Sequence, residues 1–227
     1  MKADFGLKRE INNKLFYKDV KNDSGILHFH SQIELYFITD GEMEVFVNDQ
    51  RKILKKGEMS VALSFNAHGY RTPEYSCSSY LIIPTYLCEE FLLETKEKTV
   101  ENPFICDVET VNAIYGYFNE LRKEGVNEIE KRGYIYLILG LIMKHITFKN
   151  KSLVMDSSLA SQILIYINEN YQENISSASI AKHFGYTQGH VSRQLAPLLK
   201  NLDFRVVVDE ERKPLADAFV EGIDIVY

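Results

Sequence analysis

The sequence of 227 residues has few cysteines, no excess of basic residues and no long uncharged run. Cys77, Cys88 and Cys106 are an odd set without a C-x-x-C pair, which argues against a disulfide framework or a zinc knuckle and fits reduced thiols. The net charge is −6, so any affinity for nucleic acid has to come from a local patch. The N-terminus MKADFGLKRE has no apolar segment typical of secretion, and no run could span a membrane. We expect a cytoplasmic protein with no membrane partner.

The hydrophobic pattern before about residue 85 predicts β-strands. Short runs rich in β-branched and aromatic residues are separated by turn signals, as in IELYFIT followed by DGE and MEVFVN followed by DQR. Several strands at this spacing are typical of a sandwich or small barrel. We therefore expect an antiparallel β-barrel over residues 1–100.

The pattern after that point predicts helices. Apolar residues recur three and four positions apart in residues 108–121, which gives one apolar helix face. The run from Tyr134 to Met143 is apolar on nearly every side, so a helix there needs partners all round it. We expect a helical pair over residues 101–150 that packs on its own domain and against a second subunit. The predicted dimer contacts are Tyr134, Ile138, Leu141 and Ile142.

The C-terminal third predicts a helix-turn-helix unit. The polar stretch KNKSLVMDSS is typical of a linker. In ISSASIAKHFGY a serine pair precedes an apolar-periodic run and Gly185 ends it, and TQGHVSRQLAPLLKN follows as a second short helix. Two short helices joined by a tight glycine-containing turn can place the second helix in the major groove of DNA. We assign this unit to residues 151–200.

The order of these parts, with the motifs I-x-x-Y-I-x-x-N-Y, I-A-x-x-F-G-Y and V-S-R, resembles the AraC/XylS transcriptional regulators. Phe204, Val208, Arg212 and Ala216 match the spacing of that family's helix leading to a second helix-turn-helix, and residues 201–227 would hold this helix and a truncated start of the second unit. The resemblance implies an α+β protein with a cupin-like barrel, a helical pair and an all-α DNA-binding subdomain. It also implies a small-molecule effector, double-stranded DNA and a second copy of the chain as partners, and no enzymatic activity.

The family's pattern also indicates which residues meet DNA. Gln188 suits pairing with adenine, and Arg193 suits guanine or phosphate. The predicted DNA-facing residues are Thr187, Gln188, Gly189, His190, Ser192 and Arg193. Pro197 departs from the pattern because proline disturbs a helix interior, and residues 156–227 carry six basic against ten acidic residues. A ligand-sensing dimer that does not bind DNA is therefore an alternative.

The stretch HFHSQIELYFITDG matches the cupin spacing H-x-H-x3-E-x6-G through His28, His30, Glu34 and Gly41. Gly57 and His68 stand where a second cupin motif has its glycine and third histidine. Alternate side chains of a strand share a face, so the histidines and the glutamate are expected to converge inside the barrel. They would then form the chemical centre of this domain.

Three interpretations of this centre stay open. Our main expectation is a metal-free polar pocket for a small, sugar-like effector, with no cofactor and no catalytic residue. Its lining residues would be His28, His30, Glu34, Tyr36, His68 and Tyr80, with the tyrosines stacking on the ligand or packing in the core. The second is a divalent transition metal, as in a metal-dependent cupin enzyme, with His28, His30, Glu34 and His68 as ligands. The third is a set of histidines satisfied within the barrel.

Overall fold

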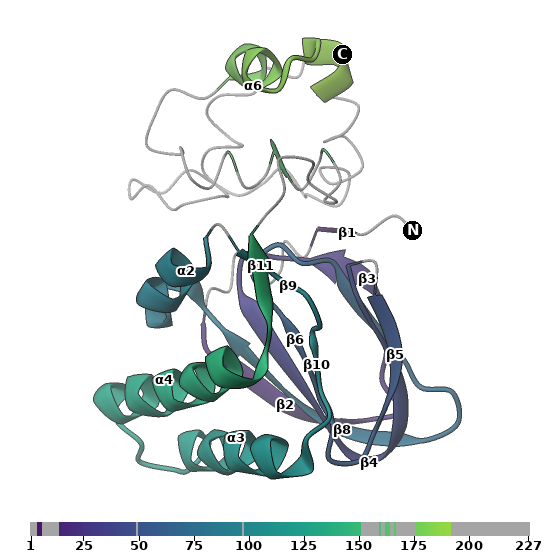
Figure 1. Cartoon of the computed structure of the whole chain (residues 1–227), viewed down its shortest axis with the longest axis vertical. Coiled ribbons are helices and arrows are strands. Elements are labelled where there is room, and N and C mark those ends of the chain that lie inside the picture. Colours follow the sequence, from purple (N-terminus) through teal and green to yellow (C-terminus); the bar gives the residue numbers. More distant parts are fainter. Residues whose placement is uncertain are drawn as a thin grey trace. The chain divides into compact units, whose positions relative to one another are not determined.

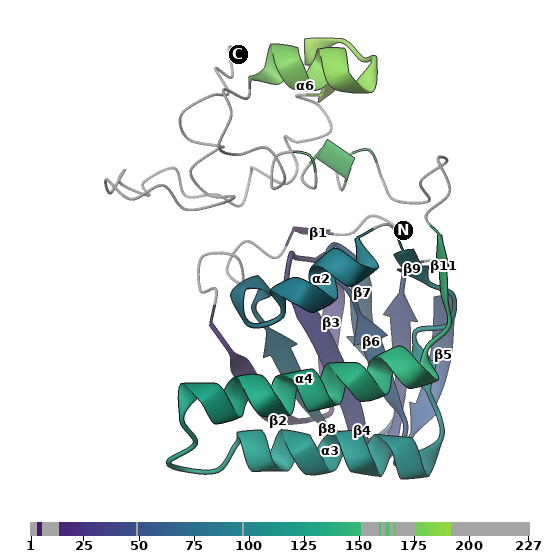
Figure 2. The same ribbon diagram turned by 60° about the vertical axis from the view of Figure 1, so that its left-hand side comes forward.

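The computed structural model divides the chain into two compact units, one of residues 1–3 and 12–154 and one of residues 4–11 and 155–227. The residues it describes are 4–5, 14–48, 50–96, 98–150, 159, 162–163, 166 and 176–191. Figure 1 shows the strands and helices of the first unit, and Figure 2 shows them turned by 60°. None of the helices in the described ranges has the length and apolar character needed to cross a membrane.

The first unit contains two antiparallel sheets that share one long strand. The first sheet has the order β3-β7-β4-β5, and the second has the order β10-β6-β4-β8-β2. The strands are β2 (Phe16–Lys21), β3 (Ser24–Phe29), β4 (Ile33–Val47), β5 (Gln50–Lys55), β6 (Met59–Ala62), β7 (His68–Arg71), β8 (Ser76–Ile83) and β10 (Phe104–Ile105). A separate pair joins β9 (Lys98–Val100) to β11 (Phe148–Asn150), and the short β1 (Asp4–Phe5) belongs to the second unit.

Strand β4 passes from one sheet into the other without a turn. Its residues 33–41 pair with β6 and β8, whereas residues 42–47 pair with β5 and β7. The change occurs at Gly41, whose φ is +69° and where an added Cβ would lie 2.3 Å from the carbonyl oxygen of Tyr75. The sequence predicted a turn at DGE. That prediction is wrong because glycine lets the strand bend and continue here.

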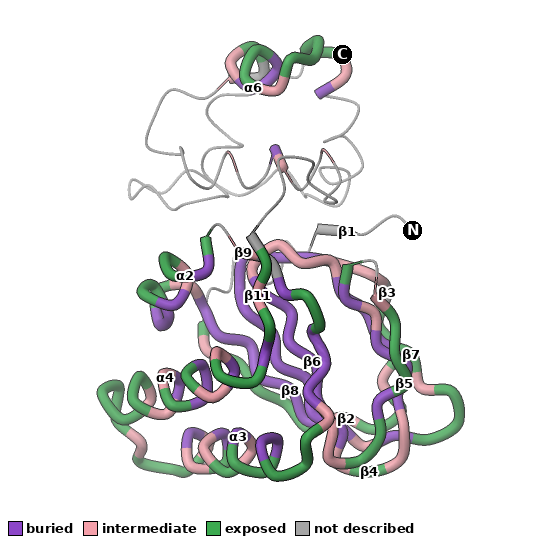
Figure 3. Tube along the Cα trace, viewed as in Figure 1, coloured by how far each residue is buried: buried purple, intermediate pink, exposed green. Residues whose placement is uncertain are grey.

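Two hydrophobic clusters lie on opposite faces of the second sheet. One fills the space between the two sheets and contains Tyr36, Ile38, Met43, Val45, Val47, Leu54, Ala62, Tyr70, Tyr80, Ile82 and Phe104. The other joins the outer face of the second sheet to the helices. Figure 3 shows the buried sides of these helices facing the sheet. The first unit thus has three layers, namely two sheets and a layer of helices. This confirms the predicted α+β class with an antiparallel β domain and a following helical pair.

The helices begin at side chains that accept backbone hydrogen bonds. α3 (Val108–Leu121) starts after Asp107, whose carboxylate accepts from the Thr110 amide at 3.0 Å. α4 (Glu128–His145) starts after Asn127 with a reciprocal capping box to Glu130. The other helical elements of this unit are η1 (Thr85–Leu87) and α2 (Glu89–Thr95).

Helix α4 turns its predicted dimer residues inward. Ile138 and Ile142 are fully buried in the cluster with the second sheet, and Tyr134 and Leu141 are half-buried against it. The prediction that Ile138 and Ile142 contact a second subunit is therefore wrong, since these side chains are used within their own unit. The sequence did not reveal this because the helix is apolar on almost every side.

The second unit contains the first of the two predicted short helices and the start of the second. Ser176 and Ser179 form a capping box at the start of α6 (Ser177–Phe184), which ends at Gly185 in the left-handed conformation. Residues 188–191 are again helical, and the Thr187 hydroxyl accepts from the His190 amide at 3.2 Å. The chain after Val191, with Pro197 and the predicted connecting helix from Phe204 to Ala216, lies outside the described residues.

Replacing Gly41 by alanine should cost about 3 kcal/mol or more of unfolding free energy, because backbone strain and a steric clash add together. Gly125, in the loop between α3 and α4, provides the matched control. Its φ is +82°, but an added Cβ would meet nothing within 4 Å, so Gly125→Ala should cost only about 1 kcal/mol. Urea denaturation followed by circular dichroism measures both variants, and equal losses would contradict the role assigned to Gly41.

Candidate functional site

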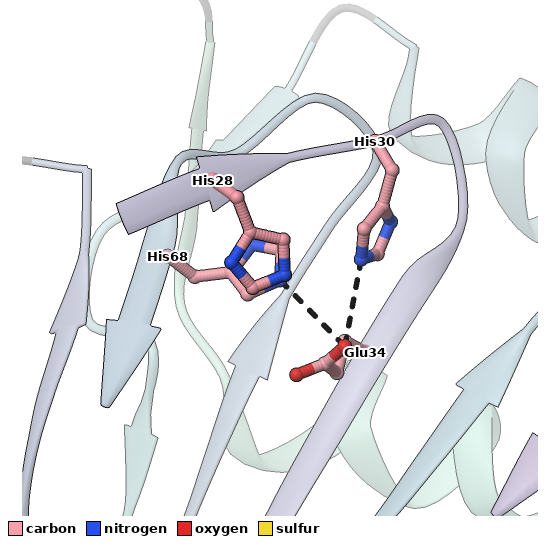
Figure 4. A group of neighbouring side chains, drawn as sticks. All are labelled: His28, His30, Glu34 and His68. Carbon is pink, nitrogen blue, oxygen red and sulfur yellow. Dashed lines mark ion pairs between the residues drawn. The ribbon is translucent and has the colours of Figure 1, made fainter. Parts of the chain in front are cut away.

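Four side chains from separate elements converge beside the core between the two sheets (Figure 4). His28 lies near the end of β3, His30 in the turn after it, Glu34 at the start of β4 and His68 at the start of β7. One potential ligand atom from each of the four lies within 4.8 Å of the others. The sequence predicted this set of residues but placed the first three on one strand, whereas β3 ends at Phe29 and the chain turns before β4.

Strand pairing and a glycine bring the histidines together. His28 and His68 are paired across β3 and β7, and the register of β3 shifts between Gly25 and His28. Gly69 accommodates this irregular strand, since an added Cβ would lie 3.1 Å from the Leu27 Cα atom and 3.2 Å from its nitrogen. A side chain at position 69 would therefore push β3 away from β7 next to the site.

Hydrogen bonds to the backbone fix two of the imidazole rings. His30 Nδ1 lies 3.1 Å from the Gln32 carbonyl oxygen, and His68 Nδ1 lies 2.8 Å from that of Asn66. A carbonyl oxygen can only accept, so Nδ1 is the protonated nitrogen in each ring, and in the neutral ring Nε2 carries a lone pair. The two Nε2 atoms are buried, and neither has a hydrogen-bond partner among the described residues. They lie 3.4 and 3.7 Å from Glu34 Oε2.

Glu34 is a buried carboxylate. Burial alone raises its pKa, but the His68 and His30 rings beside it hold that pKa well below the ordinary value of 4.5. Its stabilising contribution is therefore fully present above pH 4.5 and is lost as the pH falls through the lowered pKa. At neutral pH an anionic oxygen faces the two Nε2 atoms, and its charge is compensated either by a protonated imidazole or by a cation bound between these atoms.

The size and chemistry of this four-residue cluster fit a metal ion. A transition metal binds imidazole nitrogens and carboxylate oxygens at about 2.0–2.2 Å, so two of its ligands lie at most about 4.4 Å apart. The four potential ligand atoms lie within 4.8 Å of one another, so a small shift of the side chains lets them surround one ion. Three nitrogens and one oxygen suit a divalent ion such as iron, manganese, nickel or zinc. The backbone carbonyls that orient His30 and His68 are the partners that metal-binding histidines commonly have.

The tyrosines predicted to stack on a ligand pack against one another. Tyr36 is only 1% exposed, and its ring lies 3.9 Å from that of Tyr70 and 5.6 Å from that of Tyr80, centroid to centroid. Its hydroxyl donates to Asp23 Oδ2 at 2.8 Å. The predicted stacking of Tyr36 and Tyr80 on a sugar ring is corrected accordingly, because both buried rings are part of the core between the sheets.

Sequence reasoning missed Tyr70. Its hydroxyl donates to Glu34 Oε1 at 2.7 Å within the buried interior. The available signal was its position two residues after His68, which puts both side chains on the same face of β7.

The predicted DNA-facing residues are described only in part. Thr187, Gln188 and Gly189 are exposed, and half-buried His190 stacks on Tyr186 with ring centroids 4.7 Å apart. Ser192 and Arg193 lie outside the described residues. Exposure leaves the first three available to a partner, and their role stays a prediction.

Comparisons with known proteins find similar proteins only among solved structures. No protein-family model matches the sequence, and no curated protein matches it. The AraC-like transcriptional activator CuxR is 12% identical with a TM-score of 0.49, and the alignment covers 79% of this chain and 63% of CuxR. This chain thus spans less than two thirds of the length of CuxR.

Two further solved structures differ in the share of the chain that they match. ToxT from Vibrio cholerae is 9% identical with a TM-score of 0.45, covering 81% of this chain and 76% of ToxT. An RmlC-like cupin from Shewanella frigidimarina is 21% identical with a TM-score of 0.30, covering 32% of this chain and 68% of the cupin. These are proteins to which the chain is similar, and none of them supplies an activity for it.

Proposed function

We propose that the chain is a DNA-binding transcription regulator of AraC/XylS type whose β domain binds one divalent transition-metal ion. The observation that carries the proposal is the buried cluster of His28, His30, Glu34 and His68, with ligand atoms within 4.8 Å of one another. The DNA-binding part is supported by the I-A-x-x-F-G-Y and V-S-R motifs and by the helix, Gly185 turn and helix of residues 177–191.

A metal ion explains the cluster better than a sugar-like effector does. An ion satisfies the two unpartnered Nε2 atoms and the charge of Glu34 together, whereas the tyrosines expected to stack on an organic molecule stack on one another. An ion that joins β3 to β7 would stabilise one arrangement of the β domain over others. A regulator needs only such a difference in affinity between two states.

A metal-dependent cupin enzyme is the second candidate, because the same four residues could hold the metal ion of an enzyme or of a regulator. His30, Glu34 and His68 are buried, however, and His28 alone is half-buried, so a substrate has little access to the ion. The helix-turn-helix motifs would also have no role in an enzyme. We therefore propose a protein that is not an enzyme.

A homodimer is part of the proposal, with a corrected contact face. On α4, Gly133, Leu137 and Gly140 are exposed in line with Ile129, at helical spacings of three and four. Ile129 is 83% exposed and Leu137 is 48% exposed. We propose that this outward face, rather than Ile138 and Ile142, contacts a second copy of the chain.

Metal binding is tested on the full chain by mass spectrometry of bound metals and by thermal unfolding. The protein should hold about one equivalent of a divalent transition metal, and saturation at 100 times Kd should add about 2.7 kcal/mol of stability that a chelator removes. The His30→Gln/His68→Gln variant should lose both effects. His145→Gln, outside the cluster, should keep them. A wild-type chain that binds none of iron, manganese, cobalt, nickel or zinc would exclude the metal.

The dimer is tested by light scattering of Leu137→Asp. A buried charge at a subunit contact is costly, so this variant should be monomeric under conditions in which the wild-type chain is dimeric. Leu93→Asp is the matched control, because Leu93 is 74% exposed on another helix, α2. This variant should leave the dimer intact. A dimeric Leu137→Asp protein would rule out the proposed face.

DNA binding is tested by fluorescence anisotropy with a labelled duplex from upstream of the chain's own gene, at several salt concentrations. Arg193→Ala should weaken binding by about 1–3 kcal/mol, the cost of a lost base contact. Lys131→Ala removes the same charge from the first unit and should change binding little. Failure of the metal-loaded wild-type chain to bind at low salt would favour the sensor that does not bind DNA.

A further inference from the structure

The two oxygens of the Glu34 carboxylate have different environments. Oε1 accepts a hydrogen bond from the Tyr70 hydroxyl at 2.7 Å. Oε2 faces the Nε2 atoms of His30 and His68, at 3.4 and 3.7 Å. Only Oε2 is therefore directed to the place where the histidine nitrogens meet.

The direction of the Tyr70 bond is set by chemistry. An ionised carboxylate has no proton to give, so the phenol must be the donor and Oε1 the acceptor. A hydrogen bond to a charged acceptor is stronger than one between neutral groups. The carboxylate therefore resists rotation about its terminal bond, which would exchange its two oxygens or turn both toward an ion.

The Tyr70 ring is itself held in place. It stacks on Tyr36 with centroids 3.9 Å apart and an interplanar angle of 25°. Tyr36 is fixed in turn by its hydrogen bond to Asp23, just before β3. A chain of contacts thus runs from Asp23 through Tyr36 and Tyr70 to Glu34.

We propose that Tyr70 is a positioning residue that makes Glu34 a one-oxygen ligand of the ion. This inference builds on the metal site proposed above. With Oε1 occupied, the protein supplies four ligand atoms, namely three nitrogens and Oε2. A calcium ion, which prefers six to eight oxygen ligands and often a two-oxygen carboxylate, is disfavoured by this arrangement, and a transition metal is favoured.

The experiment loads the metal-free full chain with Co(II) and compares Tyr70→Phe with the wild type. Affinity is measured by competition with a chelator, and coordination by the visible absorption bands of Co(II). Loss of a hydrogen bond to a metal ligand commonly costs 10–100-fold in affinity, so Tyr70→Phe should bind about 10–100-fold more weakly, with altered bands as Glu34 turns its second oxygen to the ion.

Tyr80→Phe is the matched control. It removes a hydroxyl from the same group of stacked tyrosines, but from the ring that lies 5.6 Å from Tyr36 rather than from the donor to Glu34. This variant should keep the wild-type affinity and absorption bands. A change of equal size in both variants would mean that any loss from the tyrosine core disturbs the site, and would overturn the specific role of Tyr70.

The remaining outcomes separate the two proposals. Wild-type affinity and bands in Tyr70→Phe would overturn the positioning role while leaving the metal site standing. A wild-type chain that binds no Co(II) would overturn both. If Tyr70→Phe does not fold, Tyr36→Phe replaces it, because loss of the bond to Asp23 loosens the ring that holds Tyr70. Altered bands in this variant would support the proposal, and unchanged bands and affinity would overturn it.

Discussion

The close approach of Gly41 to the Tyr75 carbonyl is the constraint on which the arrangement of the β domain depends. A side chain at position 41 would clash with this carbonyl. Because glycine has none, β4 can bend here and contribute to both sheets. Its first part carries Glu34, and its second part pairs with β7, which carries His68 and Tyr70. The carboxylate and its partners thus reach one another through the bend of a single strand. A hairpin at this point would have left them in sheets with no common strand.

Strand β4 contains two buried carboxylates that the protein treats in opposite ways. Glu44 accepts hydrogen bonds from Arg51 and from Arg71, the latter at 2.6 Å, so fixed cations neutralise it. Glu34 has a phenol on one oxygen and two histidine Nε2 atoms facing the other. A buried anion needs a compensating charge. The contrast between the two residues is the physical reason for regarding Glu34 as a ligand and Glu44 as part of the framework.

Sequence patterns predicted the members of the cluster better than the geometry that joins them. Histidine and glutamate spacing identified His28, His30, Glu34 and His68, and serine and glycine identified both ends of α6. Local pattern could not distinguish a turn from a bent strand at Gly41, since glycine is compatible with both. It could not predict which face of α4 is buried either, because a helix that is apolar on nearly every side has no single apolar face. Tyr70 escaped notice because its partner is distant in sequence.

The pairing of β3 with β7 also has a consequence for the order of folding events. Strands β3 and β7 are far apart in the chain, and contacts of this kind form after local ones because closing a long loop costs entropy. His28, His30 and Glu34 are close in the sequence, so we expect His68 to complete the set of potential ligands late in folding. Any ion held there would bind the finished fold. It would lengthen the lifetime of the native state by slowing unfolding, and would leave the rate of folding almost unchanged.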